Sequence, residues 1–260
     1  MNLPFLSVEN AQAFILVLLR VSAIVTTIPV FSERSVPTQV KAGLSIILAV
    51  ILFPVVVSRF PAVSTMPLLP LIFGMIGEVM IGIIIGFGAR LVFAGIQMAG
   101  NIIGFQMGFA IVNIIDPMTS AQVSIIAELK YLIAMLIFLS INAHHFFFMA
   151  ITQSYDWIAP FGFSFSGSLM QYIFELSRDL FVIALKIGAP LMAVMLFTNV
   201  GLGVVARTVP QMNIFIVGFP LQISIGLIFL GLTAPLFSRI VQDLMNSFEY
   251  KIMTLLRLMS

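Results

Sequence analysis

Residues 91–115 read LVFAGIQMAGNIIGFQMGFAIVNII, a run of 25 residues without one charged side chain. A transmembrane helix needs about 20 mostly apolar residues to cross a hydrocarbon core roughly 30 Å thick, so this run is long enough to span a membrane. It stops at Asp116 and Pro117, and a proline disfavours helical geometry at the residue before it. The stretch therefore predicts a membrane helix whose glycine-rich C-terminal end is irregular.

The composition of the whole chain also indicates a membrane protein. Of its 260 residues, 61% are hydrophobic and only 8% are charged, and the mean hydropathy is +1.18. A soluble fold of this length needs far more polar surface. We therefore predict an all-α, polytopic membrane protein that forms a single domain over residues 1–260. The 12 Lys and Arg are scattered singly and balanced by 10 Asp and Glu, so no nucleic-acid-binding patch is indicated.

Other apolar runs accompany this stretch along the chain. Arg90 separates it from the run before it, and residues 152–179 are interpreted as a surface loop that leads into a short helix. Residues 131–151 read as an ordinary span, whereas residues 208–238 contain three prolines and should be kinked or divided. The remaining runs cover residues 11–31, 42–58, 71–89 and 180–206.

Residues 239–260 have the pattern of an amphipathic helix. Apolar residues recur there at helical spacing, and charged and polar residues lie between them. The apolar face of this C-terminal helix has two open roles: it could lie flat on the bilayer or dock on a partner protein.

Three charged residues lie within apolar runs: Arg20, Glu78 and Lys186. A charge that faces lipid costs on the order of 3 kcal/mol, so these residues should face protein, water or one another. Arg207, at the end of the run 180–206, is grouped with them. Two roles stay open, a structural ion pair or subunit contact on one side and a proton or ion relay on the other.

Glycines recur four residues apart in two of the runs. This spacing places them on one helix face, where backbones can approach closely, and we expect such tight packing at Gly82 and Gly86. Gly104 and Gly108 differ because Phe and Met residues lie between them and an Asp-Pro follows. A flexible apolar loop is the better prediction there, since soft Met and bulky Phe side chains can close an opening and still deform.

Signatures of enzyme chemistry are absent from the sequence. The only histidines, His144 and His145, are adjacent and would point about 100° apart on a helix, and no acidic cluster completes a metal site. The chain has no cysteine and no phosphate-binding glycine motif. We therefore expect no catalysis, no metal and no cofactor.

Three motifs follow one another along the chain: PVFSERSVPTQVKAGL at residues 29–44, GNIIGFQMGFAIVNIIDP at 100–117, and GLGVVARTVPQMNIFIVGFP at 201–220. In order, spacing and chain length they resemble the FliR/SctT family of the type III secretion export apparatus. The positions outside the middle motif that carry the resemblance are Arg34, Pro37, Lys41, Gly43, Arg207, Pro210, Gln211, Asn213 and Pro220.

This resemblance implies a fold and a set of partners. Bent or broken helical hairpins would assemble with FliP and FliQ into a closed, helical export gate, with FlhB at its cytoplasmic side and FlhA and the basal-body ring and rod nearby. The gate would lie in the bacterial inner membrane, partly covered by lipid, with part of it projecting towards the periplasm. It would conduct unfolded rod, hook and filament proteins.

The resemblance also implies that the middle motif forms a plug inside the pore, which substrate displaces. The residues assigned to this plug are Gly104, Phe105, Gln106, Met107, Gly108, Phe109, Ile111, Asn113, Asp116 and Pro117. An injectisome SctT-type subunit is the nearest alternative. A small-solute transporter is less favoured, because the sequence shows no polar midplane site and no internal repeat.

Overall fold

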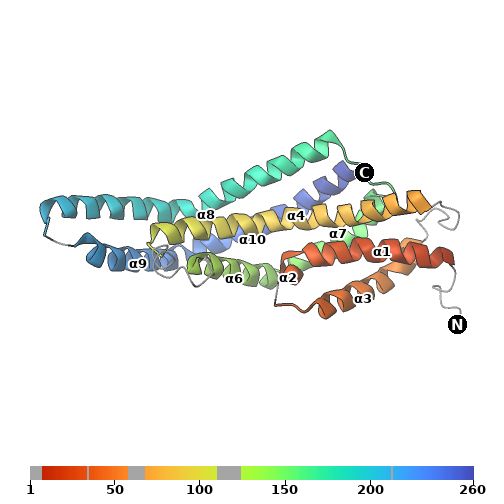
Figure 1. Cartoon of the computed structure of the whole chain (residues 1–260), viewed down its shortest axis with the longest axis horizontal. Coiled ribbons are helices and arrows are strands. Elements are labelled where there is room, and N and C mark those ends of the chain that lie inside the picture. The colour runs from red at the N-terminus through yellow and green to blue at the C-terminus, as the bar shows by residue number, and fades with distance from the viewer. Residues whose placement is uncertain (1–7, 34, 58–67, 110–123, 212) are drawn as a thin grey trace. The chain divides into compact units, whose positions relative to one another are not determined.

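The computed structural model describes residues 8–33, 35–57, 68–109, 124–211 and 213–260. Over these residues every regular element is a helix (Figure 1), which confirms the all-α prediction. The helices are α1 (Val8–Thr27), α2 (Pro29–Ser32), α3 (Thr38–Val56), α4 (Leu68–Gln106), α6 (Ile125–Ser140), α7 (His144–Trp157), α8 (Gly167–Thr208), α9 (Ile214–Leu232) and α10 (Ala234–Met259).

Several of these helices can cross a membrane. Within the described residues, α3, α4 and α8 are long and apolar enough by themselves. The pairs α6–α7 and α9–α10 bend by 65° and 55° at short breaks, and each pair is a further candidate when taken as one broken span. The predicted polytopic membrane protein with bent helices is therefore confirmed.

Helix α4 runs without interruption through Arg90, so the predicted boundary between two separate runs is wrong. The Arg90 side chain does not break the helix, because it finds acceptors at the C-terminal end of α1. Its Nε donates to the carbonyl oxygen of Thr27 at 3.0 Å and its Nη2 to that of Thr26 at 3.4 Å. A cation at a helix C-terminus also interacts favourably with the helix dipole. One charge in an apolar run thus joins two helices.

Two other boundaries differ from the sequence predictions. Residues 131–151 are not one unbroken span, because Asn142 takes a left-handed conformation with φ of 56° between α6 and α7. Asn is one of the few residues besides glycine that adopts this conformation readily. The short helix expected after a loop is instead α8, which begins at Gly167 and is 42 residues long.

The proline-rich run 208–238 is divided, as predicted, and the break falls at Thr233 between α9 and α10. Helix α10 starts at Ala234 rather than at residue 239. Its apolar face is buried against the rest of this chain, so both expected roles, lying on the bilayer or docking on a partner, are wrong. The buried residues on this face are Phe237, Val241, Met245, Phe248, Ile252, Leu255, Leu256 and Met259.

The chain divides into two compact units. Unit 1 draws on residues 1–91, 142–176 and 245–260, and unit 2 on residues 92–141 and 177–244. In unit 1, α1 and α4 approach closely at Gly82, where a Cβ atom would lie 2.5 Å from the Cβ of Ala23. A Cβ atom at Gly86 would overlap the side chain of Thr27. The predicted tight packing at Gly82 and Gly86 is confirmed.

Residues 158–166 in unit 1 connect α7 to α8 without regular structure, and residues 159, 162, 164 and 165 are exposed, which agrees with the expected surface loop. Specific contacts nevertheless hold this loop against unit 1. The Phe161 ring fills the space beside Gly74 on α4, which has no side chain to exclude it. Ser164 donates its backbone N–H to the carbonyl oxygen of Met259 at 3.0 Å, and Ser166 Oγ donates to that of Leu258 at 3.2 Å. These bonds satisfy carbonyl groups at the end of α10, which its own helix leaves unpaired.

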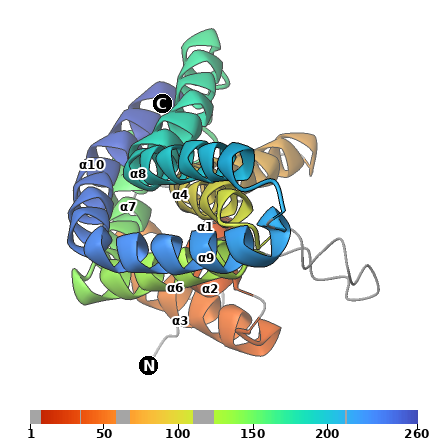
Figure 2. The same cartoon turned by 90° about the vertical axis from the view of Figure 1, so that its left-hand side faces the viewer.

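In unit 2 the C-terminal part of α4 lies beside both α8 and α9 (Figure 2). A Cβ atom at Gly95 of α4 would lie 3.0 Å from the Cβ of Ile183 on α8. Just after the end of α4, Met107 contacts Gly226 of α9. The end of α4 is therefore held between α8 and α9.

Candidate functional site

The C-terminal end of α4 carries the first residues of the predicted plug. Gly108 has φ of 88°, a left-handed conformation that glycine adopts without steric cost. Its N–H donates to the carbonyl oxygen of Phe105, and the N–H of Phe109 donates to that of Gly104, both at 3.1 Å. This pair of bonds is a Schellman motif, which terminates an α-helix. Helix α4 therefore ends at a fixed point just before residues 110–123.

Gly104 lies inside α4 and packs tightly against the start of α6. A Cβ atom at Gly104 would overlap Oγ of Ser124, and one at Gly100 would overlap Cα of Ala127. Ser124 is also the N-cap of α6, since its Oγ accepts from the N–H of Ala127 at 3.4 Å. The flexible loop predicted at Gly104 is therefore wrong, because close contact with α6 holds this glycine in the helix.

Two bulky residues at this end of α4 face opposite environments. Phe105 is 73% exposed, whereas Met107 is fully buried. Met107 belongs to an apolar cluster with Ile103, Ile126, Leu191 and Met195, contributed by α4, α6 and α8. Buried Met107 therefore anchors the helix end, while the apolar ring of Phe105 stays exposed.

Gln106 and Phe109 are the other described plug residues. Gln106 Oε1 is buried and accepts no hydrogen bond from the residues that the structure describes, and Phe109 is partly buried against the apolar cluster around Met107. The other four assigned residues lie outside the described residues, so their role stays a prediction. They are Ile111, Asn113, Asp116 and Pro117.

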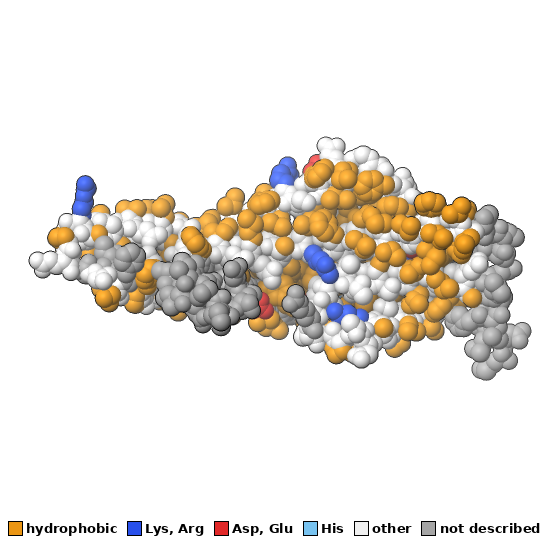
Figure 3. All heavy atoms as spheres, viewed as in Figure 1, with side chains coloured by type: hydrophobic (Ala, Val, Ile, Leu, Met, Phe, Trp, Pro, Cys, Tyr) orange, Lys and Arg blue, Asp and Glu red, His pale blue; other side chains and the backbone are white. Residues whose placement is uncertain are grey.

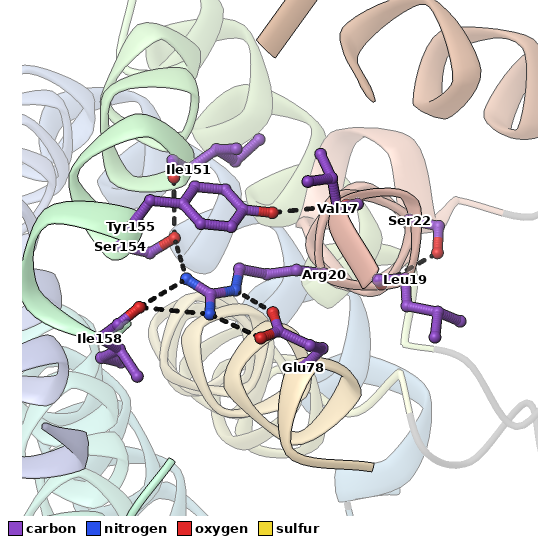
Figure 4. A network of polar contacts seen from close by, with 9 residues as sticks. All are labelled: Val17, Leu19, Arg20, Ser22, Glu78, Ile151, Ser154, Tyr155 and Ile158. Atoms are coloured by element: carbon purple, nitrogen blue, oxygen red, sulfur yellow. Dashed lines mark hydrogen bonds and ion pairs between the residues drawn. The ribbon is translucent and has the colours of Figure 1, made fainter. Parts of the chain in front are cut away.

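A buried ion pair joins α1 to α4 (Figure 4). Arg20 and Glu78 are 0% and 1% exposed. The Nε of Arg20 donates to Oε2 of Glu78, and its Nη2 donates to Oε1 at 2.9 Å. Such two-pronged bonding between guanidinium and carboxylate is among the strongest side-chain interactions. These two charges therefore neutralise each other inside unit 1.

Residues from α7 complete the contacts of Arg20. Its Nη1 donates to Oγ of Ser154 at 3.2 Å and to the carbonyl oxygen of Ile158 at 3.3 Å. Its Cζ lies 4.0 Å from the centroid of the Tyr155 ring, within cation–π range. We call the five residues Arg20, Glu78, Ser154, Tyr155 and Ile158 the arginine clamp. Sequence reasoning missed the last three, because residues 152–156 read TQSYD and resemble a polar surface segment.

The other two charges assigned with Arg20 and Glu78 are placed differently. Lys186 and Arg207, both on α8, are exposed, so burial within the chain is the wrong expectation for them. Contact with a neighbouring subunit stays a prediction. Sequence reasoning missed another buried charge, Lys130 of α6, which is 4% exposed. Its Nζ lies 4.1 Å from the centroid of the Phe237 ring.

The first family motif surrounds the start of α3. Pro37 is the N-cap of this helix, and Lys41 Nζ donates to the backbone carbonyl oxygen of Glu33 at 3.0 Å. Gly43 faces open space, since a Cβ atom there would meet nothing within 4 Å. Arg34 lies outside the described residues.

The third family motif forms the connection between α8 and α9. Pro210 and Gln211 lie in an exposed turn. Asn213 begins the next helix, because its carbonyl oxygen accepts from the N–H of Ile216 at 3.1 Å. Pro220 lies inside α9. These positions shape a helical hairpin within unit 2.

One face of the chain carries many exposed apolar side chains (Figure 3). Hydrophobic side chains cover much of the face in Figure 3, and the cationic side chains on it stand singly. Among the described residues, no three His, Cys, Asp or Glu side chains come together where a metal ion could bind. This surface is therefore suited to contact with other apolar surfaces.

Comparison with known proteins places these features in a family. Residues 11–248 match the family model described as bacterial export proteins, family 1. Flagellar biosynthetic protein FliR of Bacillus subtilis (strain 168) is 37% identical over 86% of each chain. FliR of Aquifex aeolicus (strain VF5) is 30% identical over 93% of this chain and 95% of its own. FliR of Escherichia coli (strain K12) is 29% identical over 88% and 87%.

Proposed function

We infer the function of the chain from its family: it belongs to the bacterial export proteins, family 1, and is a flagellar biosynthetic protein of the type III export apparatus. On this premise the chain is a subunit of the export gate through which unfolded rod, hook and filament proteins cross the bacterial inner membrane. The observation that carries the proposal is its 37% identity to a flagellar FliR over 86% of both chains.

The proposed partners are FliP and FliQ in a hetero-oligomer, with FlhB, FlhA and the basal-body ring and rod around it. Helices α4 and α8 have 39 and 42 residues, which is about 58 and 63 Å at roughly 1.5 Å per residue. The hydrocarbon core is only about 30 Å thick, so lipid cannot cover both helices along their whole length if they stand across it. Other subunits would cover the rest, with part of the assembly projecting towards the periplasm.

The segment after α4 would act as the plug of this gate. In the proposed mechanism the plug consists of a rigid base and an apolar part that blocks the pore. The Schellman motif at Gly108 and the buried Met107 fix the base, while the exposed ring of Phe105 lies beside the path of the substrate. An incoming unfolded chain would push the obstruction aside, with energy from other components and the proton gradient. The chain itself would make or break no covalent bond.

A flagellar role is favoured over the injectisome alternative. The three relatives described above are all flagellar biosynthetic proteins. A small-solute transporter finds no support in the described residues, where the buried charges of the arginine clamp are paired with each other.

Disulfide crosslinking to a stalled substrate tests the proposal. The chain has no cysteine, so Phe105→Cys and Phe109→Cys each introduce a unique thiol at the base of the plug. A secretion substrate with one cysteine and a folded domain that blocks its exit would be trapped in the gate. We expect a disulfide adduct with both variants.

Tyr250→Cys is the matched control, because Tyr250 is 73% exposed like Phe105 but lies on α10 in unit 1. It should give no adduct with the stalled substrate. If Phe105→Cys and Phe109→Cys are both silent while the substrate demonstrably blocks export, the plug role is refuted.

A further inference from the structure

Helix α8 presents a long apolar face that nothing in unit 2 covers. Residues three or four apart along this helix share one side, and those at 182, 185, 189, 193, 196, 200 and 204 are all exposed. Phe197, beside this row, is 75% exposed. We call this surface, from Phe181 to Val204, the α8 face. A contiguous apolar surface of this length is typical of a site that binds protein or lipid.

One cation, Lys186, lies within the α8 face. Its neighbours Phe181, Val182 and Leu185 are exposed hydrophobic residues. Within the described residues Lys186 makes no salt bridge and no hydrogen bond. By contrast Arg178, two turns earlier on the same helix, pairs with Asp179 at 3.6 Å. The α8 face therefore carries an unneutralised positive charge.

The covering of this face must satisfy both the apolar residues and the charge. Hydrocarbon from lipid covers the apolar residues, but placing the Lys186 charge in it costs about 3 kcal/mol. Open water solvates the Lys186 charge but leaves the exposed leucine, valine and phenylalanine side chains uncovered. An apolar helix that bears one carboxylate satisfies both, because an opposite charge at Lys186 compensates for its removal from water.

We propose that the α8 face docks another membrane-protein subunit, and that this subunit places an Asp or Glu side chain against Lys186. The inference rests on the proposed function, since the occupant would be a subunit of the same export assembly. The apolar residues supply most of the contact area, and the Lys186–carboxylate pair fixes the register of the two helices.

Charge reversal tests the ion pair. Lys186→Glu would place two like charges together, and removing a buried partner reduces complex formation by on the order of 30-fold or more. We expect the tagged variant, purified in mild detergent from cells that make the whole export apparatus, to recover correspondingly less of one other subunit. Lys186→Arg should recover that subunit normally. Arg178→Glu, which alters an exposed pair on the same helix, should also behave like the unmodified chain.

A second measurement guards against simple misfolding of Lys186→Glu. A photoreactive amino acid in place of Leu185 leaves Lys186 intact and lies on the α8 face. Ultraviolet irradiation should give an adduct with a protein subunit. Suppressor mutations that restore motility to Lys186→Glu should replace an acidic residue of that same subunit by Lys or Arg.

The outcomes separate this inference from the proposed function. If the unmodified chain purifies without any export subunit, the proposed function fails and this inference fails with it. If it purifies with its subunits and Lys186→Glu does so equally well, only this inference is overturned. Absence of a protein adduct at Leu185 from an intact assembly would likewise overturn it, in favour of lipid or water at the α8 face.

Discussion

Replacing Glu78 by Gln removes one charge of the arginine clamp and preserves its size. Arg20 then stays buried, with Ser154 and the carbonyl oxygen of Ile158 as acceptors at 3.2 and 3.3 Å, but without a counter-ion. Breaking a buried ion pair in this way costs about 3–5 kcal/mol. Because two acceptors remain, we expect the lower end, a loss of about 3 kcal/mol in the free energy of unfolding. This corresponds to roughly a 150-fold shift towards the unfolded chain.

Removing the second charge as well should restore part of this loss. In the double variant with Arg20→Met no charge is buried, and two polar groups lose their partner: the carbonyl oxygen of Ile158 and the amide introduced at position 78. The Ser154 hydroxyl still donates to the carbonyl oxygen of Ile151. An unsatisfied buried polar group costs about 1–3 kcal/mol, so the double variant should lose about 2 kcal/mol. It should therefore be more stable than Glu78→Gln alone. Titration of SDS into mixed micelles of the purified chain measures these free energies.

Arg178→Gln provides the control, since it breaks an ion pair whose arginine is 72% exposed. Exposed pairs contribute about 0–1 kcal/mol, so this variant should unfold almost like the unmodified chain. The reasoning is refuted if Glu78→Gln and Arg178→Gln lose the same free energy. It is also refuted if the double variant loses the sum of its two single losses, because the two charges would then act independently.

Three more changes have defined outcomes in the same unfolding measurement. Gly104→Ala places a Cβ atom against Ser124 and should lower the free energy of unfolding by about 1–3 kcal/mol. Gly201→Ala is the control and should be neutral or stabilising, because a Cβ atom there meets nothing within 4 Å. Equal effects of the two changes would disprove tight packing of α4 on α6. Gly108→Ala forces a side chain into a left-handed conformation and places a Cβ atom 2.8 Å from Cδ1 of Phe219, so it should cost at least about 1–2 kcal/mol. An unchanged free energy of unfolding would argue against the Schellman motif. Lys130→Met removes a buried ammonium whose neighbour is the ring of Phe237, so we expect stability to stay level or rise; a loss above about 2 kcal/mol would mean that the cation–π contact dominates.

The buried charges illustrate what the sequence could and could not predict. Arg20 and Glu78 stand out because each interrupts an apolar run, and the cost of a charge in lipid predicts that they need partners. The two residues lie 58 positions apart in the sequence, so no local sequence pattern predicts that they pair with each other. Lys130 was missed for the opposite reason, because a charge at the edge of an apolar run resembles an ordinary helix end.

The end of α4 shows the same limit at the candidate site. Glycine has low helix propensity, and Gly104 and Gly108 therefore looked alike in a Phe- and Met-rich stretch. The structure separates them: close contact with Ser124 keeps Gly104 helical, and Gly108 ends the helix at positive φ. Only the contact with α6, which is not encoded in the neighbouring residues, distinguishes the two.

The bend between α6 and α7 had a local signal that the hydropathy pattern obscured. Residues 131–151 are apolar enough to pass for one span, but Asn142 is a residue type that tolerates left-handed backbone. Hydropathy identifies which segments avoid water, and it does not register a single residue that redirects the backbone.

Unit 1 is assembled from both halves of the sequence, so it cannot fold completely while the chain is still being synthesised. Residues 245–260 are made after the rest of unit 1, yet Leu255 and Phe248 cover Gly88 of α4, and Leu258 and Met259 accept the hydrogen bonds from residues 164–166. During most of translation the earlier helices of unit 1 therefore lack these contacts. The nascent chain must keep its apolar surfaces in the bilayer or with a chaperone until the last turns of α10 leave the ribosome, since such exposed surfaces aggregate.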